Sequence, residues 1–274
     1  MSKKNFLNIT FACCLAVWLA SCSKEDNPSV PEPVGSEYAV SQIRDVTVGS
    51  EHSGVATYTY DIMGRPLEHV VEGYVETDRY GITSNYTYGD REIVGKESQT
   101  LRDVFKLDDS GHIVEDIHYP EVAAPYTLTF TYDEKGQIAT YDADESLYEF
   151  HWKDGDLMGW DQIADGKVIS TATIEYTDIE SEYCLMSSVF SSWDVMLYAR
   201  GYYGKVSRHL PLQVKKMSVT DASVIFYIED IYTYELTDGR VTSYTCQGEM
   251  ETTMFGQSIK TKRTSTYQVS WKKL

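Results

Sequence analysis

The sequence from Thr57 to Leu67 reads TYTYDIMGRPL and has the pattern of one β-hairpin. Its first part alternates threonine with tyrosine, and both residue types suit a pleated, half-buried strand. Asp61 can accept hydrogen bonds from the turn backbone, and Gly64 can adopt the positive φ that a tight turn needs. The stretch therefore predicts a strand, an Asp/Gly turn and the start of a returning strand.

Variants of this unit recur along the chain. The further copies are Tyr86–Ile93, Phe105–Ile113, Phe130–Ile138, Phe150–Leu157 and Tyr232–Val241, and a half-copy is Asp165–Val168. The glycines at positions 64, 89, 111, 136 and 155 are 25, 22, 25 and 19 residues apart. A repeat of this length is one hairpin with its connection. We therefore predict an all-β, mainly antiparallel chain, a serial hairpin meander that forms a curved sheet or a soluble, barrel-like structure.

Two further strands can be assigned to a place in this sheet. Tyr126–Tyr132 alternates large apolar residues with threonines, which predicts one packed face and one wet face. Ser223–Ile228 is apolar on both faces, which predicts a central strand. The order Tyr-Asp-x-x-Gly-Arg at Tyr60–Arg65 also resembles the YD repeat of Rhs-type proteins. That resemblance implies hairpins that follow one another in a sheet.

Residues 1–22 are predicted to be a lipoprotein signal peptide with its lipobox. Two lysines precede a mostly apolar run that ends at Ala20 and is short for a membrane span. Leu19–Cys22 resembles the lipobox of bacterial lipoproteins. The resemblance implies that the thiol of Cys22 is diacylglycerated and that the chain is cut before it, and two or three acyl chains anchor a protein firmly. An ordinary secretory signal with an incidental cysteine is the alternative.

Residues 23–37 are predicted to be an acidic, Pro-rich tether, because three prolines and few apolar side chains follow the lipobox. Lys24, Glu25 and Asp26 resemble the acidic signal that sends some lipoproteins to the outer face of the outer membrane. A tether that is merely acidic is the alternative. The expected location is the outer membrane, lipid-anchored, with the cell surface slightly favoured over the periplasmic face.

One helix is predicted, over residues 182–199. Apolar residues recur at steps of three or four from Tyr183 to Leu197, and a glycine and a proline follow. The next run, Gly201–Pro211, reads GYYGKVSRHLP. Together with the lipobox and the hairpins, it resembles an uncharacterised family of bacterial lipoproteins with a porin-like fold, over nearly the whole mature chain. Residues 38–274 are then one hairpin-repeat domain, with a subdivision near residues 176–216 as the alternative.

The charge of the chain excludes one class of partner. The formal net charge is −18, and loss of residues 1–21, which hold two lysines and no acids, makes it −20. Nucleic-acid binding needs clustered cations, so no nucleic-acid partner is expected. The basic clusters Lys215–Lys216, Lys260–Arg263 and Lys272–Lys273 are interpreted as charges that protect a sheet surface and its edges.

Neither a transmembrane barrel nor a catalytic site is indicated. Thr, Lys, Asp and Glu occur on both faces of most strands, whereas a transmembrane strand needs an apolar lipid-facing side. No His or Cys pair has the spacing of a metal site, and no nucleophile elbow or phosphate-binding loop occurs. We expect no metal, no cofactor and no enzymatic activity. Cys184 and Cys246 are a candidate disulfide in an oxidising compartment, if their Cα atoms lie close enough.

Aromatic residues carry the functional hypotheses. Trp152 and Trp160, in a chain with 22 tyrosines, are candidates for binding a glycan by stacking. The alternative is that tyrosine is simply a favoured strand residue. The first hypothesis is a lipid-anchored envelope binding or scaffold protein, with a glycan or an envelope protein as partner. The alternative is a periplasmic carrier of a lipid-like ligand in a half-closed barrel, motivated by Val224–Ile228. An enzyme acting on polysaccharide would need two carboxylates that converge in a cleft.

Overall fold

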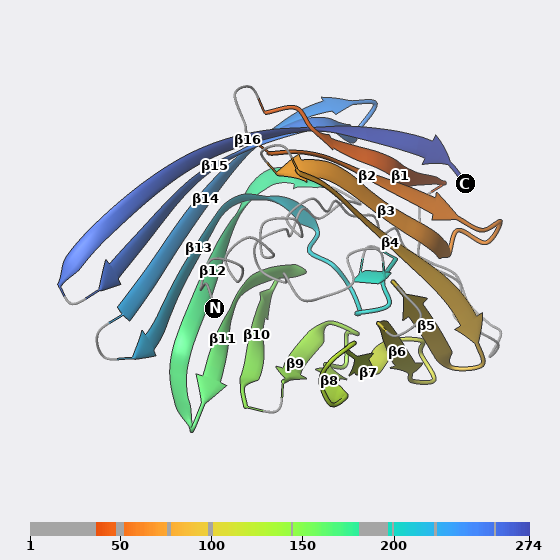
Figure 1. Cartoon of the computed structure of the whole chain (residues 1–274), viewed down its shortest axis with the longest axis horizontal. Coiled ribbons are helices and arrows are strands. Elements are labelled where there is room, and N and C mark those ends of the chain that lie inside the picture. The colour runs from red at the N-terminus through yellow and green to blue at the C-terminus, as the bar shows by residue number, and fades with distance from the viewer. Residues whose placement is uncertain are drawn as a thin grey trace.

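The computed structural model describes residues 37–47, 52–75, 78–97, 101–143, 145–180, 197–198, 200–221, 224–254 and 256–274. These residues form sixteen strands, each antiparallel to the next, and the first strand pairs with the last to close a barrel. Figure 1 shows this closed wall. The predicted all-β hairpin meander is therefore confirmed, in its closed form.

The strands are β1 (Tyr38–Asp45), β2 (His52–Tyr60), β3 (Pro66–Val75), β4 (Asp78–Gly89), β5 (Glu92–Lys96), β6 (Arg102–Leu107), β7 (Ile113–Tyr119), β8 (Tyr126–Tyr132), β9 (Ile138–Asp142), β10 (Leu147–Lys153), β11 (Asp156–Ala164), β12 (Lys167–Glu180), β13 (His209–Asp221), β14 (Val224–Thr237), β15 (Arg240–Met254) and β16 (Gln257–Lys273). No helix among the described residues is long and apolar enough to cross a membrane. The strand β14 pairs with both β13 and β15, so the predicted central strand is confirmed.

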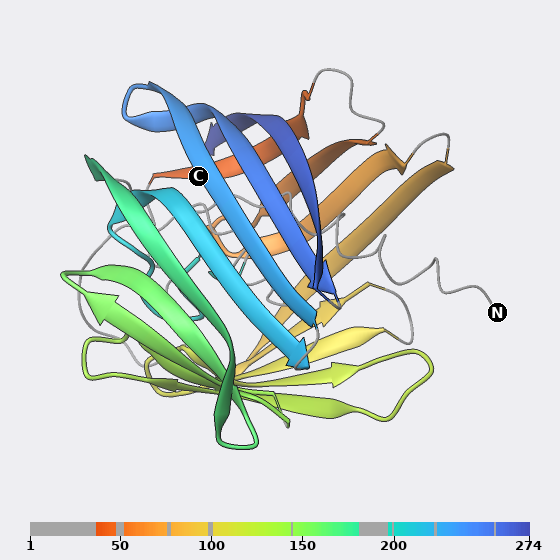
Figure 2. The ribbon, with the colours of Figure 1, turned by 90° about the vertical axis from the view of Figure 1, so that its left-hand side faces the viewer.

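The wall of the barrel is uneven in height. Strands β12–β16 have 13 to 17 residues each, and we call them the tall wall. Strands β5–β10 have 5 to 7 residues each, and we call them the low wall. Figure 1 shows the long arcs of the tall wall beside the short strands of the low wall, and Figure 2 shows β13–β16 running side by side.

Three turns at one end of the barrel, which we call the turn end, are built in the same way. In the first, Oδ1 of Asp61 accepts hydrogen bonds from the N–H groups two and four residues on, each at 2.9 Å. Gly64 completes the turn with a φ of +74°. The same arrangement recurs at Asp108–His112 and Asp133–Gln137. The aspartate and glycine of the quoted stretch therefore have the roles that the sequence predicts.

The remaining turns of the repeat are tighter. Asp154–Gly155, Asp165–Gly166 and Asp238–Gly239 are two-residue loops in which both residues have positive φ, as type I′ hairpins require. The copy at Gly89 differs from the prediction. There the loop is Asp90–Arg91, with a φ of +55° at Arg91, and Gly89 ends β4 instead of forming the turn.

Aromatic side chains link neighbouring hairpins at the turn end. The hydroxyl of Tyr132, at the end of β8, donates a hydrogen bond of 2.6 Å to the carbonyl oxygen of Ile113, at the start of β7. The equivalent bonds run from Tyr60 to Val40, Tyr88 to Pro66, Trp152 to Ile138, Tyr176 to Leu157, Tyr234 to Pro211 and Trp271 to Val241. We call these seven bonds the aromatic latches. They satisfy the one polar group of each ring while its apolar body stays in the core.

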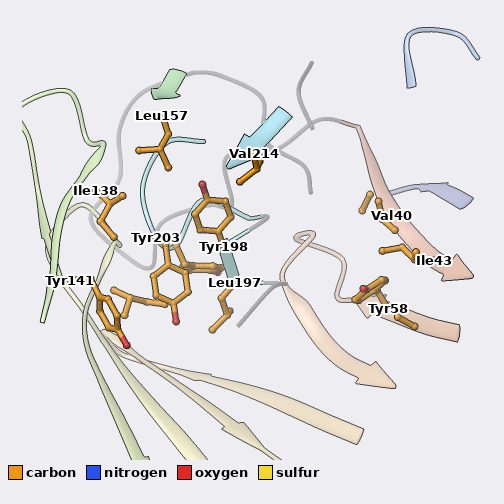
Figure 3. Packing of buried hydrophobic residues seen from close by; sticks show 14 of the residues in the cluster. Val40, Ile43, Tyr58, Ile138, Tyr141, Leu157, Leu197, Tyr198, Tyr203 and Val214 are labelled. Carbon is orange, nitrogen blue, oxygen red and sulfur yellow. The ribbon is translucent and has the colours of Figure 1, made fainter. Parts of the chain in front are cut away.

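The described residues just before β13 lie inside the barrel at the same end. We call Arg200–Arg208 the plug, and Leu197 and Tyr198 precede it. Figure 3 shows Leu197, Tyr198 and Tyr203 between residues of opposite sides of the barrel. Of the helix predicted over residues 182–199, nearly all lies outside the described residues. Leu197 and Tyr198 are helical, and the N–H of Gly201 bonds the carbonyl of Tyr198 at 2.9 Å.

Backbone hydrogen bonds fix the plug to successive hairpins. Its carbonyl at Tyr202 accepts from the N–H of Ile113 at 2.7 Å, and its N–H at Lys205 donates to the carbonyl of Gly136 at 2.8 Å. A Cβ atom on Gly204 would lie 2.6 Å from that same carbonyl oxygen. The backbone of the plug therefore lies directly against the backbone of the turns at this end. A side chain at Gly204 would prevent this close approach.

The two faces of the wall differ in character. In β8 the buried residues Leu128 and Phe130 point inward and the threonines between them point outward, as predicted. On the outer face of the tall wall, Lys215, Glu229, Glu249 and Lys262 lie in one row across β13–β16. Lys215 contacts Glu229 at 3.6 Å, and Lys262 contacts Glu249 at 3.1 Å. These lysines are surface charges, as interpreted.

Two members of the basic clusters point inward instead. Lys216 lies with its ammonium 5.0 Å from the ring centre of Trp160. Arg263 contacts both carboxylate oxygens of the fully buried Asp230 at 3.1 Å. Because side chains alternate between the faces of a strand, adjacent basic residues cannot all be surface charges.

Replacing Tyr132 by Phe tests the latches. The substitution leaves the buried carbonyl of Ile113 without this donor, and we expect the free energy of unfolding to fall by about 1–2 kcal/mol. Urea unfolding measures the change. Tyr227→Phe, on the outer face of β14, is the matched control and should cost less than about 0.5 kcal/mol. Equal losses in the two variants would show that the latch contributes nothing beyond a general Tyr-to-Phe effect.

Candidate functional site

Several residues singled out in the sequence lie outside the described part of the chain. These are Cys22, Lys24, Glu25, Asp26 and Cys184. In the structure Cys246 is a free cysteine, buried on the inner face. Burial raises the pKa of its thiol to about 12. Whether oxidation joins Cys184 to Cys246 stays a prediction.

The two candidate glycan-binding tryptophans do not form an exposed platform. Trp160 is 1% exposed and packs against Tyr148, with ring centres 5.5 Å apart. Trp152 is half-buried, and its indole N–H donates a latch hydrogen bond to the carbonyl oxygen of Ile138. Both rings belong to the inner face, where they fill space between strands. In this protein, the aromatic residues that alternate with polar residues along these strands line the inside of the barrel.

The turn end of the barrel is filled by the plug. Arg200 is 3% exposed and lies against Gly64, where a Cβ atom would be 2.8 Å from its Nη2. Tyrosines surround it, and its Nε and Nη1 have no hydrogen-bond partner. Burial lowers the pKa of Arg200, and the nearby phenol groups oppose that shift. This guanidinium closes the lumen beneath the β2–β3 turn.

At the opposite end, which we call the open end, the inner face of the tall wall is exposed. Met250 and Met254 follow Cys246 on the same face of β15, and Ile259 of β16 pairs with Thr252 on that face. Their exposed fractions are 42%, 45% and 69%. Phe226 and Ile228 of β14 lie beside them and are partly exposed. Beyond the ion pair of the buried Asp230 with Arg263, this wall therefore presents an apolar inner surface that is exposed among the described residues.

The inner face of the low wall is polar at the same end. Asp103 of β6 bonds His118 of β7, and the hydroxyl of Ser84 donates to Glu97 at 3.3 Å. Asp116 is buried one step deeper on β7, and Tyr126 of β8 is 47% exposed beside His118. We call Glu97, Asp103, Asp116, His118 and Tyr126 the acidic cluster.

Burial and mutual repulsion set the electrostatics of this cluster. Burial raises the pKa of Glu97, and the charge of Asp103 raises it further. Burial also raises the pKa of Asp103, against the hydrogen bond and charge of His118. Carboxylates with raised pKa values are common in ligand sites, since a bound ligand with positive charge reduces the repulsion between them. The described residues contain no group of three or more His, Cys, Asp or Glu placed to hold a metal ion.

The apolar surface and the acidic cluster lie on opposite sides of the barrel. In the closed ring of sixteen strands, β7 and β15 are eight strands apart in either direction, since fifteen minus seven is eight. The apolar residues come from β14–β16, and the acidic cluster is centred on β6–β8. A molecule that enters the open end would meet both.

This arrangement was not visible in the sequence. The members of the acidic cluster lie up to 29 residues apart, from Glu97 to Tyr126, and adjoin one another only through cross-strand pairs such as Asp103 with His118. The alternation of β15 did contain a signal for the apolar surface. Cys246, Gly248, Met250 and Met254 share one face, and only the first two are buried.

Comparison with known proteins bears on the fold. No protein-family model and no curated protein matches the chain. The crystal structure of a porin-like protein from Bacteroides uniformis does match, with a TM-score of 0.61 and 19% sequence identity. The match covers 85% of this chain and 98% of that chain.

The barrel has a porin-like fold. The fold implied by the sequence resemblance is therefore confirmed, whereas membership of a lipoprotein family stays a prediction.

Glu97→Gln tests the electrostatics of the acidic cluster. Because the folded-state pKa of Glu97 is raised, its ionisation destabilises the fold as pH rises through that pKa, and the cost is absent below the unfolded-state value. We expect the variant to unfold at a higher urea concentration than the parent at pH 7 and at the same concentration near pH 4. Glu92→Gln, on the outer face of β5 beside Lys106, should show no gain at pH 7. A loss of stability at pH 7 for Glu97→Gln would contradict this account.

Proposed function

We propose that this protein is an envelope-anchored, non-catalytic binding protein that takes up a small ligand through the open end of its barrel. The observation that carries the proposal is the exposed apolar inner surface at Met250, Met254 and Ile259. Uncovered apolar residues on a concave face are costly in water and commonly mark a binding surface. This supports the carrier hypothesis over a glycan site at Trp152 and Trp160.

The outer face supports a barrel that stands in water. Its row of charges of both signs across β13–β16 includes Lys215, Glu229 and Lys262, and lipid-facing charges are costly in a membrane barrel. Strands of 5 to 7 residues in the low wall are also short for a membrane crossing. An anchor outside the barrel is then what would hold the protein at the envelope.

The position of the chain ends supports an orientation for such an anchor. The N–H of Leu274 bonds the carbonyl of Glu37 at 2.8 Å, so both ends of the barrel sequence lie at the turn end, beside the plug. A tether that joins at Glu37 would place the filled end toward the membrane. The open end would then face away from it, toward the compartment from which a ligand comes.

Binding is proposed over catalysis because the exposed inner surface is mainly apolar. Two carboxylates, Glu97 and Asp103, do adjoin each other, as a polysaccharide hydrolase would require. Each of them already has a hydrogen-bond partner, Ser84 for Glu97 and His118 for Asp103. A glycan ligand and a scaffold role remain outcomes that the binding experiment can reveal.

Mass spectrometry of purified residues 23–274, the mature chain without the lipid-bearing Cys22, tests the proposal. This fragment contains every described strand, and the purification uses no detergent. We expect a small apolar or amphipathic molecule to co-purify from the cells that produce it. Met250→Gln with Met254→Gln should remove that molecule, since these side chains line the open end. The matched control is Met217→Gln, on the outer face of β13 and 46% exposed.

A folded parent chain that carries no molecule in excess of the double variant would overturn the proposed function. Circular dichroism of all three proteins checks that folding is unaffected. A sugar that co-purifies with the parent and is lost in the double variant would keep the binding role and change the ligand class.

The anchor is tested by metabolic labelling of the full chain with radioactive palmitate. We expect label in the parent protein and none in Cys22→Ser, because the thiol of Cys22 is the predicted attachment atom. Cys14→Ser, in the apolar run of the signal segment, should be labelled like the parent. Equal labelling of Cys22→Ser and the parent would exclude Cys22 as the attachment site.

A further inference from the structure

We propose that the ligand of the open end is an amphipathic organic cation, with an apolar body against the tall wall and an N–H-bearing cationic group at the acidic cluster. The inference rests on the proposed function and adds the chemical class of the ligand. It follows from the two unlike surfaces that face each other across the lumen.

The apolar half of the site is defined by five side chains of the tall wall. Phe226, Ile228, Met250, Met254 and Ile259 share the inner face of β14–β16 and line three adjacent strands. They lie beyond the ion pair of the buried Asp230 with the partly exposed Arg263, so both charges at the base of the surface are paired. Methionine side chains adapt to ligands of different shape, and a flexible hydrocarbon chain or ring system suits this lining.

The charged half of the site offers acceptors. Three carboxylates, from Glu97, Asp103 and Asp116, gather on the inner face of the low wall. The imidazole of His118 lies beside them and forms a hydrogen bond with Asp103. The half-exposed ring of Tyr126 adds an aromatic face, which attracts a cation. A cationic group placed here would relieve the repulsion between the carboxylates, whereas an anion would increase it.

A histidine beside the cluster adds no positive charge to it. His69 of β3 is the cross-strand neighbour of Ser84, which donates to Glu97. The ring stacks on Tyr58, with ring centres 4.9 Å apart, and its Nε2 is buried. Burial lowers the pKa of His69 to about 4, so the ring is neutral. The cluster therefore keeps its negative charge on this side.

The inner cations do not offer an equivalent site for an anion. Arg263 is neutralised by both oxygens of Asp230. Lys216 lies over the ring of Trp160, and burial lowers its pKa. Both belong to the tall-wall side, away from the acidic cluster. The charge available to an entering molecule at the low wall is therefore negative.

Titration calorimetry of the mature chain with three probes of equal tail length tests the inference. The probes are dodecylamine, dodecyl maltoside and dodecanoate, each below its micelle concentration at pH 7.5. We expect dodecylamine to bind at least tenfold more tightly than the other two. Glu97→Gln with Asp103→Asn should abolish that preference.

The matched control is Glu92→Gln with Glu115→Gln. These carboxylates lie on the outer face of the low-wall strands β5 and β7, and their loss changes the net charge equally. The control should keep the full preference for dodecylamine. Met250→Gln with Met254→Gln should weaken all three probes together, because it alters the surface for the tail. Thermal unfolding of each variant establishes that it is folded.

The outcomes separate this inference from the proposed function. Equal affinity for the three probes, or a preference for dodecanoate, overturns the cation and leaves a binding protein. A preference for dodecylamine that survives Glu97→Gln with Asp103→Asn also overturns it, because the acidic cluster would not be its source. If no probe binds the folded chain, the inference falls, and the co-purification experiment alone decides the proposed function.

Discussion

The aromatic latch is the interaction on which the barrel depends. A hairpin pairs its own two strands through its turn, but a closed ring also needs each hairpin to be held to the next at a defined angle. A buried phenol or indole supplies this by donating to a carbonyl at the start of the preceding strand, as Tyr132 does to Ile113. The bond is directional and the ring is bulky, so both hydrogen bonding and packing fix the junction. The other even-numbered strands repeat it around the ring, whereas β6 carries the buried Leu107 at the equivalent position before its turn aspartate, Asp108, and leucine has no polar hydrogen to donate.

A ring of sixteen strands is too wide for its own side chains to fill. About eight strands give an interior that side chains can pack, and sixteen leave a channel unless something else enters. Here the plug enters at the turn end, and its backbone bonds to successive hairpins, at Ile113 and Gly136 among others. Glycines make this approach feasible, since a Cβ on Gly204 would collide with a carbonyl. The latches, the plug and the three Asp/Gly turns at Asp61, Asp108 and Asp133 lie at one end, and beyond them the inner face of the tall wall is exposed among the described residues.

The fold was predictable from the sequence because its determinants are local. Asp61 and Gly64 define a turn within five residues, and repetition of that turn implies a meander. The repeat does not distinguish a curved sheet from a closed barrel, because closure depends on the pairing of β1 with β16, more than 200 residues away in the chain. The candidate site was not predictable for the same reason. Glu97 and His118 become part of a cluster only through their cross-strand neighbours. Trp160, which the sequence offered as a candidate for stacking on a glycan, is 1% exposed. Period-two patterning says which residues share a face, but it does not say which face is inside.

The strand order of the barrel does not determine which residue types lie on the inner and outer faces of its wall. The strand order resembles that of a porin-like protein. On the tall wall, the inner face carries the buried aromatic residues, and the outer face carries a row of charges beside exposed apolar residues such as Met217 and Ile225. Apolar side chains on the inner face are stable where a second layer of side chains packs against them. Packing is complete at the turn end, where Tyr203 is fully buried, and it stops where the tall wall rises past the low wall. The uncovered residues there, Met250 and Ile259 among them, are a continuation of the core without its second layer. Water is a poor second layer for such a surface, and a ligand with an apolar body is a better one.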